Sequence, residues 1–497
     1  MTRPTIAQAL AWRPEALREL AAGWDAAADT VRAKASTASS PPDWRGRTAD
    51  AASVRMRSLV EEADAVAGTL GTAAAAARAG CDRIAAARAE LLARVADAND
   101  LGFVVADDGS VAPVADHAAV GVAALAEEIG AALDRLGEAD ADAARDIDAG
   151  ASMEADVVAD WPTMDGDRIA DQIAAMTASQ RTRLIEEAPS IVGNTNGVPW
   201  DMRFAANRMN IAQAVRDETG TGPDALRRIG FYLDLLREVD DPAGSGQRVD
   251  RQILAFDPAR STLVELNGDL ETARSVAVLV PGMNTTVEGS AANTDTARRF
   301  VAATHGEVAA ITYLGGPFPH GGNVVAALAE AADPHFALEM APRLAEFSVD
   351  VDRTVDATGR QVAVTYVGHS YGGSILGTAE ALGMTADRTL YVAAAGAGVG
   401  VDGPGDWHNR NPNVLRFSMT APGDVIELVQ GLPGGPHGAD PDEMPGVIRL
   451  ATGHYDDGRP MAGPRAHTDV IDRPDSDSWR TILAVITGDR EHIQVAG

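Results

Sequence analysis

The chain has 497 residues, a formal net charge of −30 at pH 7 and a single cysteine, Cys81. This length exceeds the roughly 250–300 residues at which one hydrophobic core stops growing, so we expect more than one domain. Nucleic acids and anionic lipid surfaces bind clustered Lys and Arg, so the acidic balance argues against both as partners. One thiol excludes an internal disulfide and a thiolate metal site.

The first part of the chain predicts an all-α domain over residues 1–160. Large apolar residues from Trp12 to Val31 recur at helical spacing, and two prolines then end that helix. An Ala-rich stretch after Trp44-Arg45-Gly46 predicts one or two long helices, which return along the first. We expect a short β-hairpin with an Asp-Gly turn over residues 101–111, and then a helix from about Val114 to Val158.

Helical patterns continue through a connecting segment, residues 161–245, that we assign to the region after it. They extend to about Val239, with a polar break at residues 193–197. The Gly/Pro/Ser/Asp cluster at residues 240–246 then favours a boundary or a tight connection.

Residues 246–497 predict an α/β domain. Short apolar runs, several of them β-branched, predict strands, and helical segments separate most of the strands from Val276 onward. This alternation implies a mostly parallel sheet that is covered by helices on both faces. The predicted strands are residues 253–256, 263–266, 276–280, 308–313, 362–367, 390–394, 414–419 and 447–451.

A G-x-S-x-G motif, Gly368-His-Ser-Tyr-Gly372, follows the predicted strand 362–367 and precedes a predicted helix over residues 373–382. This strand–turn–helix context is typical of a nucleophile elbow, in which the flanking glycines avoid Cβ collisions. The helix N-terminus also offers free N–H groups and partial positive charge to an oxyanion. Ser370 is therefore the predicted nucleophile.

The serine needs a base and a carboxylate, which follow it in the order Asp or Glu and then His. Asp424, after the strand 414–419, is the favoured acid, with an ordinary turn residue as the alternative. His467, in a polar loop before the C-terminal helix, is favoured as the base over His454, which follows the last strand. His492, in the tail, is discounted.

Two backbone N–H groups are candidates for an oxyanion hole. One belongs to Tyr371, which follows the serine, and the other to Met283, in the loop after the strand 276–280. A simple connection is the alternative interpretation of that loop.

Other signals favour neither a cofactor nor a metal. Residues 398–403 match the dinucleotide fingerprint G-x-G-x-x-G, but no helix pattern follows to receive a pyrophosphate. The histidines at positions 320, 335, 408 and 437 lack paired metal spacing.

At these residues the chain resembles the α/β-hydrolase domain of unknown function that occurs in many actinobacterial proteins, from roughly Gln180 to the C-terminus. The resemblance implies an α/β-hydrolase fold after the helical bundle and a serine hydrolase, and it favours Ser370, Asp424 and His467. The segments that carry it are residues 180–189, 192–199, 205–208, 280–284, 368–372 and 421–424, together with His467.

The first hundred residues resemble the WxG helical-hairpin proteins that type VII secretion exports, through Trp44-Arg45-Gly46 at the turn. The first tyrosine of the chain is Tyr232, so the Tyr-x-x-x-Asp/Glu signal of the smaller exported proteins cannot follow this hairpin. The N-terminus lacks the apolar core of a secretory signal, and no apolar run is long enough to span a membrane. We expect a cytoplasmic protein or one exported by type VII secretion.

The sequence therefore predicts a serine hydrolase that cleaves a carboxylic ester, of a small molecule or a lipid, through an acyl-enzyme. A thioester, an amide or acyl transfer would use the same residues. The rival hypothesis is a secreted or partner-binding protein, whose helical module binds a helical protein partner beside a vestigial hydrolase scaffold. Residues 318–347 are interpreted as a covering helix, with a lid over Ser370 as the alternative.

Overall fold

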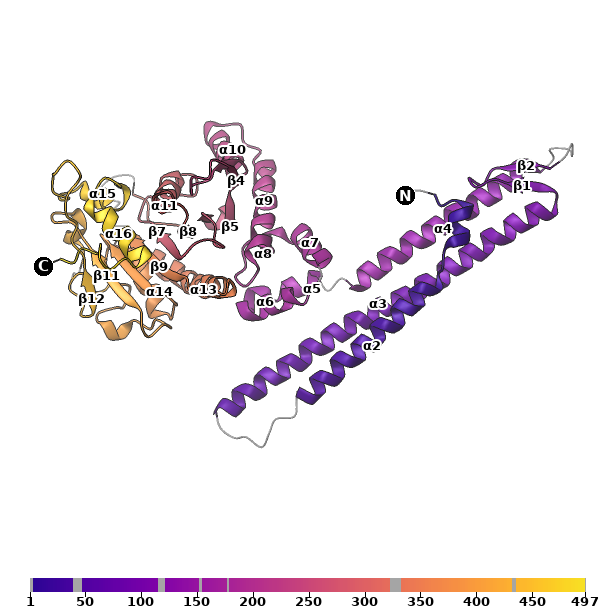
Figure 1. Ribbon diagram of the computed structural model, residues 1–497, viewed down its shortest axis with the longest axis horizontal. Coiled ribbons are helices and arrows are strands. Elements are labelled where there is room, and N and C mark those ends of the chain that lie inside the picture. Colours follow the sequence, from indigo (N-terminus) through magenta and orange to yellow (C-terminus); the bar gives the residue numbers. More distant parts are fainter. Residues whose placement is uncertain are drawn as a thin grey trace. The chain divides into compact units, whose positions relative to one another are not determined.

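The computed structural model describes residues 3–38, 47–114, 121–151, 154–176, 178–321, 332–430 and 435–496. The chain divides into two compact units, Met1–Val157 and Val158–Gly497. Figure 1 shows the helices and strands of the two units.

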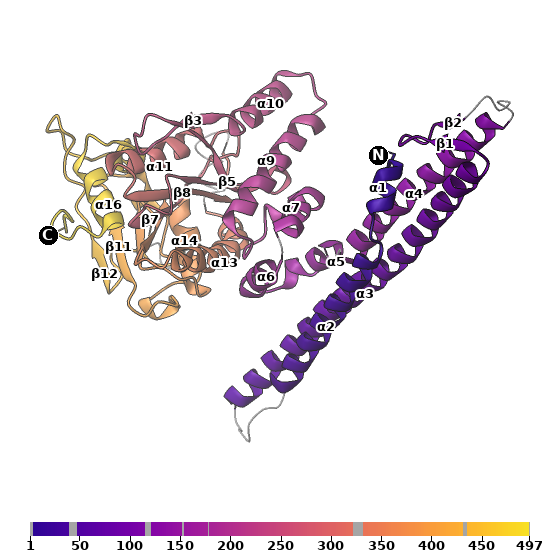
Figure 2. The same ribbon diagram turned by 45° about the vertical axis from the view of Figure 1, so that its right-hand side comes forward.

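The N-terminal unit consists of three long helices that pack side by side, with a short helix and a hairpin at one end (Figure 2). Backbone and side-chain oxygens of Asp107, in the hairpin turn, accept hydrogen bonds from the first N–H groups of the short helix. The elements are α1 (Ile6–Ala11), α2 (Glu15–Ala38), α3 (Arg47–Asp100), β1 (Phe103–Val105), β2 (Val111–Pro113) and α4 (Val122–Ala151), followed by α5 (Glu154–Ala159).

Small side chains let these helices approach closely. A Cβ added at Gly80 of α3 would lie 2.6 Å from the Cβ of Ala143 of α4. Ala74 and Ala77 of α3 and Ala21 of α2 are fully buried in the same way. Close contact between backbones thus replaces large core side chains in this part of the unit.

The predicted hairpin is confirmed, and the stretch after Gly46 is one helix. The predicted helix from about Val114 is present as α4 from Val122, whereas the Val114 N–H donates to Gly102 O beside the hairpin; residues 115–120 lie outside the described residues. Trp44-Arg45-Gly46 lies outside the described residues. In the ranges that are described, no helix is long and apolar enough to cross a membrane.

The second unit is built around an eight-stranded sheet with the strand order β12-β11-β10-β9-β7-β8-β6-β5. The strands from β12 to β8 pair in parallel, and β8, β6 and β5 pair antiparallel. The strands of this sheet are β5 (Gln252–Asp257), β6 (Thr262–Asn267), β7 (Ser275–Val280), β8 (Val308–Gly315), β9 (Ala363–His369), β10 (Arg388–Val392), β11 (Leu415–Met419) and β12 (Val447–Arg449).

Helices precede the sheet and alternate with its strands. The leading helices are α6 (Gly166–Ala174), α7 (Ala178–Glu187), α8 (Pro189–Val192), α9 (Trp200–Asp217) and α10 (Pro223–Leu235). The helices between and after the strands are α11 (Ala291–Ala303), α13 (His335–Ala357), α14 (Tyr371–Ala381), α15 (Ala466–Asp472) and α16 (Asp477–Thr487). Short 3₁₀ helices span Trp161–Thr163, Pro258–Arg260, Pro404–Asp406 and Val425–Leu428.

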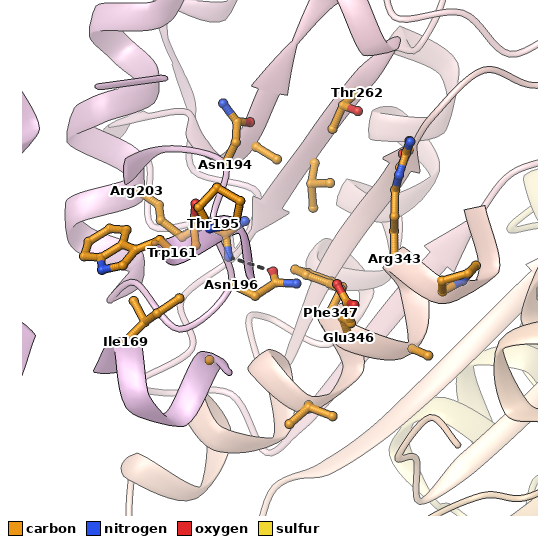
Figure 3. A pocket seen from close by; sticks show the side chains of 18 of the residues that line it. Trp161, Ile169, Asn194, Thr195, Asn196, Arg203, Thr262, Arg343, Glu346 and Phe347 are labelled. Carbon is orange, nitrogen blue, oxygen red and sulfur yellow. Dashed lines mark hydrogen bonds between the residues drawn. The ribbon is translucent and has the colours of Figure 1, made fainter. Parts of the chain in front are cut away.

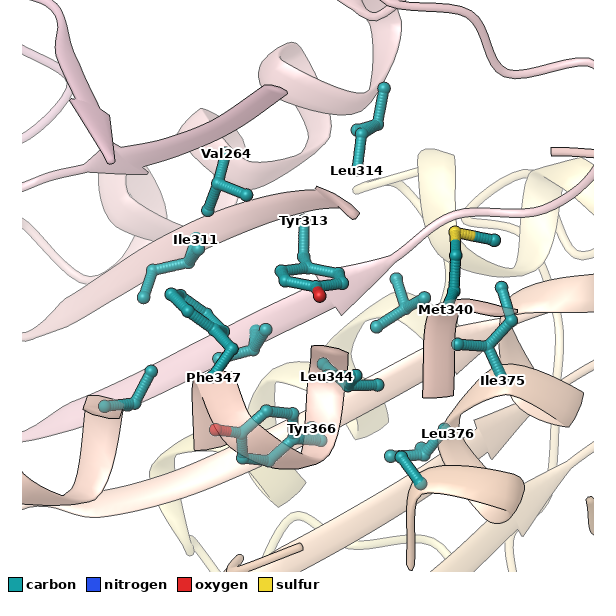
Figure 4. Close-up of a cluster of buried hydrophobic side chains, with 14 of the residues drawn as sticks. Val264, Ile311, Tyr313, Leu314, Met340, Leu344, Phe347, Tyr366, Ile375 and Leu376 are labelled. Carbon is teal, nitrogen blue, oxygen red and sulfur yellow. The ribbon is translucent and has the colours of Figure 1, made fainter. Parts of the chain in front are cut away.

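Alternate residues of the central strands enter two cores, one on each face of the sheet. Along β7, Val276, Val278 and Val280 face the core under α13 and α14, whereas Ala277 and Leu279 face the core under α11 and α16. Figure 4 shows the first of these cores. Burial of both faces explains why β7 is apolar from Val276 to Val280.

All eight predicted strands of the sheet are present, whereas the helical pattern expected up to about Val239 needs correction and the covering helix expected over residues 318–347 is confirmed in part. Val239 lies in a strand, because β3 (Glu238–Asp240) and β4 (Arg248–Asp250) form a hairpin with the cluster at residues 240–246 as its tight connection. Residues 335–347 belong to the covering helix α13, and part of the remaining segment lies outside the described residues.

Polar side chains of the leading helices cover the edge strand β5. Asn194 accepts from the Phe256 N–H (2.8 Å) and donates to Phe256 O (3.2 Å). Asn207 donates to Ile253 O (3.0 Å), and Arg203 donates to Leu254 O (2.7 Å). These bonds satisfy backbone groups that an exposed sheet edge would leave open to other chains.

Asp350 of α13 holds these helices from the other side. Its carboxylate, 1% exposed, accepts from the Gly197 N–H (2.7 Å) and the Trp200 Nε1–H (3.0 Å). It also accepts from Arg203 (2.9 Å) and Arg353 (2.8 Å). Burial lowers the pKa of Arg203, and the Asp350 charge opposes that shift. Figure 3 shows Arg203 beside Asn194 and Asn196, next to a cavity of about 1070 Å³.

Replacing Asp350 tests this interlock. Asp350→Ala leaves the buried Arg203 cation without its counter-charge and the Gly197 and Trp200 N–H groups without their acceptor, so the free energy of unfolding should fall by about 3–5 kcal/mol in urea denaturation. Asp356→Ala, at an exposed position of the same helix, is the control and should change it by less than about 0.5 kcal/mol. Equal effects of the two substitutions would contradict the interlock.

Candidate active site

Ser370 lies in a strained turn between β9 and α14. Its backbone has φ 55° and ψ −122°, a conformation that L-residues rarely adopt. The Ser370 N–H donates to Val392 O at the end of β10, and Ser370 O accepts from the Ala395 N–H, both at 3.0 Å. The end of the neighbouring strand β10 and the residues after it therefore hold the serine in this conformation.

The two glycines of the motif stand where no side chain fits. A Cβ at Gly368 would lie 2.6 Å from Gly372 O, and a Cβ at Gly372 would lie 2.1 Å from Val280 O. Val280 is the last residue of β7, so the start of α14 touches the end of a neighbouring strand. This contact sets the position of the helix N-terminus beside Ser370.

Asp424 follows β11 and caps the short 3₁₀ helix Val425–Leu428. Its Oδ1 accepts from the Ile426 N–H at 2.9 Å, and the side chain is fully buried. A buried carboxylate fixed by a backbone donor presents its remaining lone pairs in one direction, which here is toward His467.

His467 lies between the serine and the carboxylate. Its Nδ1 is 2.9 Å from Asp424 Oδ1, and its Nε2 is 3.0 Å from Ser370 Oγ. The prediction that His467 occupies a loop is wrong, because it is the second residue of α15. A backbone bond from the Gly463 N–H to Pro422 O ties the approach to α15 to the loop of Asp424.

The other two histidine candidates lie elsewhere on the surface. The His454 side chain is 62% exposed and is 3.9 Å from Asp477. The His492 side chain is 74% exposed and pairs with Asp489. Among the described residues, the histidine that contacts both Ser370 and Asp424 is His467.

His369, which the sequence analysis did not single out, fixes the backbone of His467. Its Nε2 is 2.7 Å from His467 O, so the neutral ring donates a hydrogen bond there. Burial and the neighbouring His467 lower the pKa of His369 to about 4. His369 stands between the first glycine of the G-x-S-x-G motif and the serine. Because the motif allows any residue at this position, the sequence gives no reason to assign His369 a role.

The two predicted oxyanion donors border Ser370 from different elements. Tyr371 is the first residue of α14, where a helix N–H has no intrahelical acceptor. Met283 follows Gly282, and a Cβ at Gly282 would lie 2.7 Å from Ser370 Cβ. The loop is held by the Asn284 N–H, which donates to Pro319 O (2.8 Å). The role of either N–H stays a prediction.

A cavity of about 560 Å³ lies at Ser370, within the size range of small-molecule sites. His437, discounted in the sequence analysis, lines it, and its Nδ1 is 2.8 Å from Ser374 Oγ. The larger cavity of Figure 3 shares no lining residue with this one. Within the described ranges no three His, Cys, Asp or Glu residues are grouped as metal ligands.

Comparison with known proteins agrees with this architecture. Residues 257–433 match a family model described as alpha/beta hydrolase. The C-terminal part is an α/β-hydrolase domain. The match is narrower than the resemblance inferred from residue 180 onward, and it does not include His467.

Two uncharacterized proteins of Mycobacterium tuberculosis, one from strain CDC 1551 / Oshkosh and one from strain H37Rv, are also similar. Each is 27% identical over 259 residues, which is 45% of this chain and 38% of the relative. The chain therefore matches well under half the length of these relatives.

Gly372→Ala tests the contact between α14 and β7. The added Cβ would collide with the carbonyl of Val280, so we expect the free energy of unfolding to fall by about 1–3 kcal/mol in urea denaturation. Gly405→Ala is the matched control, because no atom lies within 4 Å of the added Cβ there. An unchanged stability of the Gly372 variant would refute the close contact.

The lowered pKa of His369 predicts how the free energy of unfolding depends on pH. Its folded pKa of about 4 is below the unfolded value near 6.5, so its stabilising contribution is complete above pH 6.5 and is lost as pH falls toward 4. The difference in unfolding free energy between the wild type and His369→Gln should therefore shrink by on the order of 2 kcal/mol from pH 7 to pH 4. A difference independent of pH would contradict a neutral His369.

Proposed function

We propose that the hydrolase domain is a serine hydrolase that cleaves carboxylic esters through an acyl-enzyme formed on Ser370. The observation that carries this proposal is the chain of hydrogen bonds from Ser370 Oγ through His467 to Asp424, at 3.0 and 2.9 Å. Each contact is within the range in which a nucleophile and its base exchange a proton.

The first half of the reaction forms the acyl-enzyme. Ser370 Oγ attacks the ester carbonyl while its proton moves to His467 Nε2. Asp424 accepts the Nδ1–H of His467 and stabilises the imidazolium that forms. The N–H groups of Tyr371 and Met283 stabilise the oxyanion, one such donor typically contributing about 10²–10³ in rate. The tetrahedral intermediate then collapses: the imidazolium gives its proton to the departing alcohol, and the acyl group stays on Ser370.

The second half releases the acid. A water molecule loses a proton to His467 Nε2 and attacks the acyl carbonyl. When this second tetrahedral intermediate collapses, His467 returns the proton to Ser370 Oγ and the carboxylic acid departs. The 5% exposure of Ser370 leaves Oγ accessible only from the cavity, where substrate and water enter.

Two features support an active enzyme over the vestigial scaffold of the rival hypothesis. Ser370 keeps a strained backbone, which persists only where the surroundings impose it. Asp424 is a fully buried carboxylate, which is costly unless it is paired. Measurements with substrates decide whether the bond cleaved is an ester, a thioester or an amide.

A fluorophosphonate probe tests the nucleophile. We expect the purified full-length protein to be labelled on Ser370 and the Ser370→Ala variant to lose labelling while its circular dichroism is unchanged. Ser374→Ala is the control, because this serine lies one helical turn away and bonds to His437. Equal labelling of the wild type and Ser370→Ala would refute the assignment.

Asp424→Asn tests the carboxylate. The amide cannot stabilise the imidazolium of His467, so we expect kcat for the best p-nitrophenyl ester to fall by on the order of 10²–10⁴. Glu427→Gln, on the adjoining 3₁₀ helix, should retain kcat within about twofold, since the Glu427 side chain accepts a hydrogen bond from the Gly423 N–H and not from His467. Retention of full kcat by Asp424→Asn would remove Asp424 from the mechanism.

A further inference from the structure

The cavity at Ser370 has a one-sided charge. Among the described residues that line it there is no Lys or Arg, and the single carboxylate is that of Asp472. Apolar side chains from residues 425–429 and Ile471 form one part of the wall. Polar residues of the wall are Asn293 and Thr296 on α11 and Thr468 on α15. A bound molecule therefore meets a negative group without a compensating cation.

Asp472 is on the same helix as the proposed base. It ends α15, five residues after His467, and Thr468 and Ile471 of that helix also line the cavity. In the proposed mechanism His467 protonates the departing alcohol, so the alcohol portion of an ester lies toward His467. The side chains that α15 adds to the cavity consequently face the leaving group.

The Asp472 carboxylate is only partly satisfied. Its Oδ1 accepts from Thr296 Oγ1 at 2.5 Å, whereas Arg299 bonds to the main-chain oxygen of Asp472 and is itself exposed. Thr296 is the described side chain that hydrogen-bonds to this carboxylate. Burial raises the pKa of Asp472, and the Thr296 hydrogen bond and the Arg299 charge oppose the rise. A donor supplied by a ligand would stabilise such a group.

We propose that Asp472 selects the leaving group of the ester: an alcohol that carries a hydroxyl or ammonium group and no negative charge. This inference rests on the proposed function and adds the substrate class. A carboxylate accepts hydrogen bonds from such groups and attracts a cation, whereas an anionic leaving group meets a like charge in a partly desolvated cavity. The net charge of −30 adds a field that repels anions.

Four esters of one acyl chain measure this selectivity. The acyl chain is the one that a p-nitrophenyl series ranks first, and the alcohols are ethylene glycol, choline, propanol and glycolate. We expect kcat/KM of the wild type to be at least about tenfold higher for the ethylene glycol or the choline ester than for the glycolate ester. The first two arms distinguish recognition of a hydroxyl from recognition of a cation.

Three variants separate charge selection from a structural role. Asp472→Asn removes the charge and keeps an acceptor for Thr296, so kcat/KM for the glycolate ester should rise at least tenfold relative to the propyl ester. Asn293→Lys adds a cation to the cavity wall and leaves the contact between Asp472 and Thr296 intact, so it should act in the same direction. Thr296→Val removes that contact and keeps the charge, so the ester ranking should not change.

The outcomes are distinct. A wild type that hydrolyses the neutral esters without disfavouring the glycolate ester overturns the selectivity and leaves the proposed function standing. The selectivity is also overturned if Asp472→Asn and Thr296→Val lower kcat/KM for all four esters in the same proportion. Asp472 would then serve only to hold α15 in place through Thr296. Absence of hydrolysis for every ester, with no fluorophosphonate labelling, overturns the proposed function and this inference together.

Discussion

The close approach of α14 to the end of β7 is the constraint on which the candidate site depends. Because Gly368 and Gly372 carry no Cβ, the helix can start immediately beside Val280. Ser370, between the strand and the helix, has a left-handed backbone conformation. The same approach brings the loop of Met283 against the serine. Nucleophile, helix N-terminus and loop are therefore positioned by one steric contact, and a single extra methyl group would disturb all three.

Parallel pairing brings the remaining groups to this place. β9, β10 and β11 are neighbours, so Ser370 and Asp424, which follow β9 and β11, emerge at the same edge of the sheet. His467 arrives from 97 residues beyond the serine, on a short helix fixed by the loop of Asp424 and by His369. The cavity then combines these groups with Asp472, and its composition defines the proposed substrate class.

The leading helices stabilise the hydrolase domain, although none of their described residues lines the cavity at Ser370. Asn194, Asn207 and Arg203 bond to the backbone of β5, and Asp350 connects them to α13. These side chains replace the neighbouring strand that an edge lacks. The polar break at residues 193–197 thus packs against the sheet through Asn194, which bonds to the backbone of Phe256.

The sequence by itself determined the strands, the elbow and the order of Ser370, Asp424 and the histidines, because these follow from local apolar runs and turn chemistry. It left His467 and His454 open, and it placed His467 in a loop, because a seven-residue helix has too few turns for a recognisable pattern. Only the tertiary structure decided which histidine meets both partners, and it alone brought His369 and Asp472 to the cavity. These placements depend on contacts between residues far apart in the chain, which no local pattern encodes.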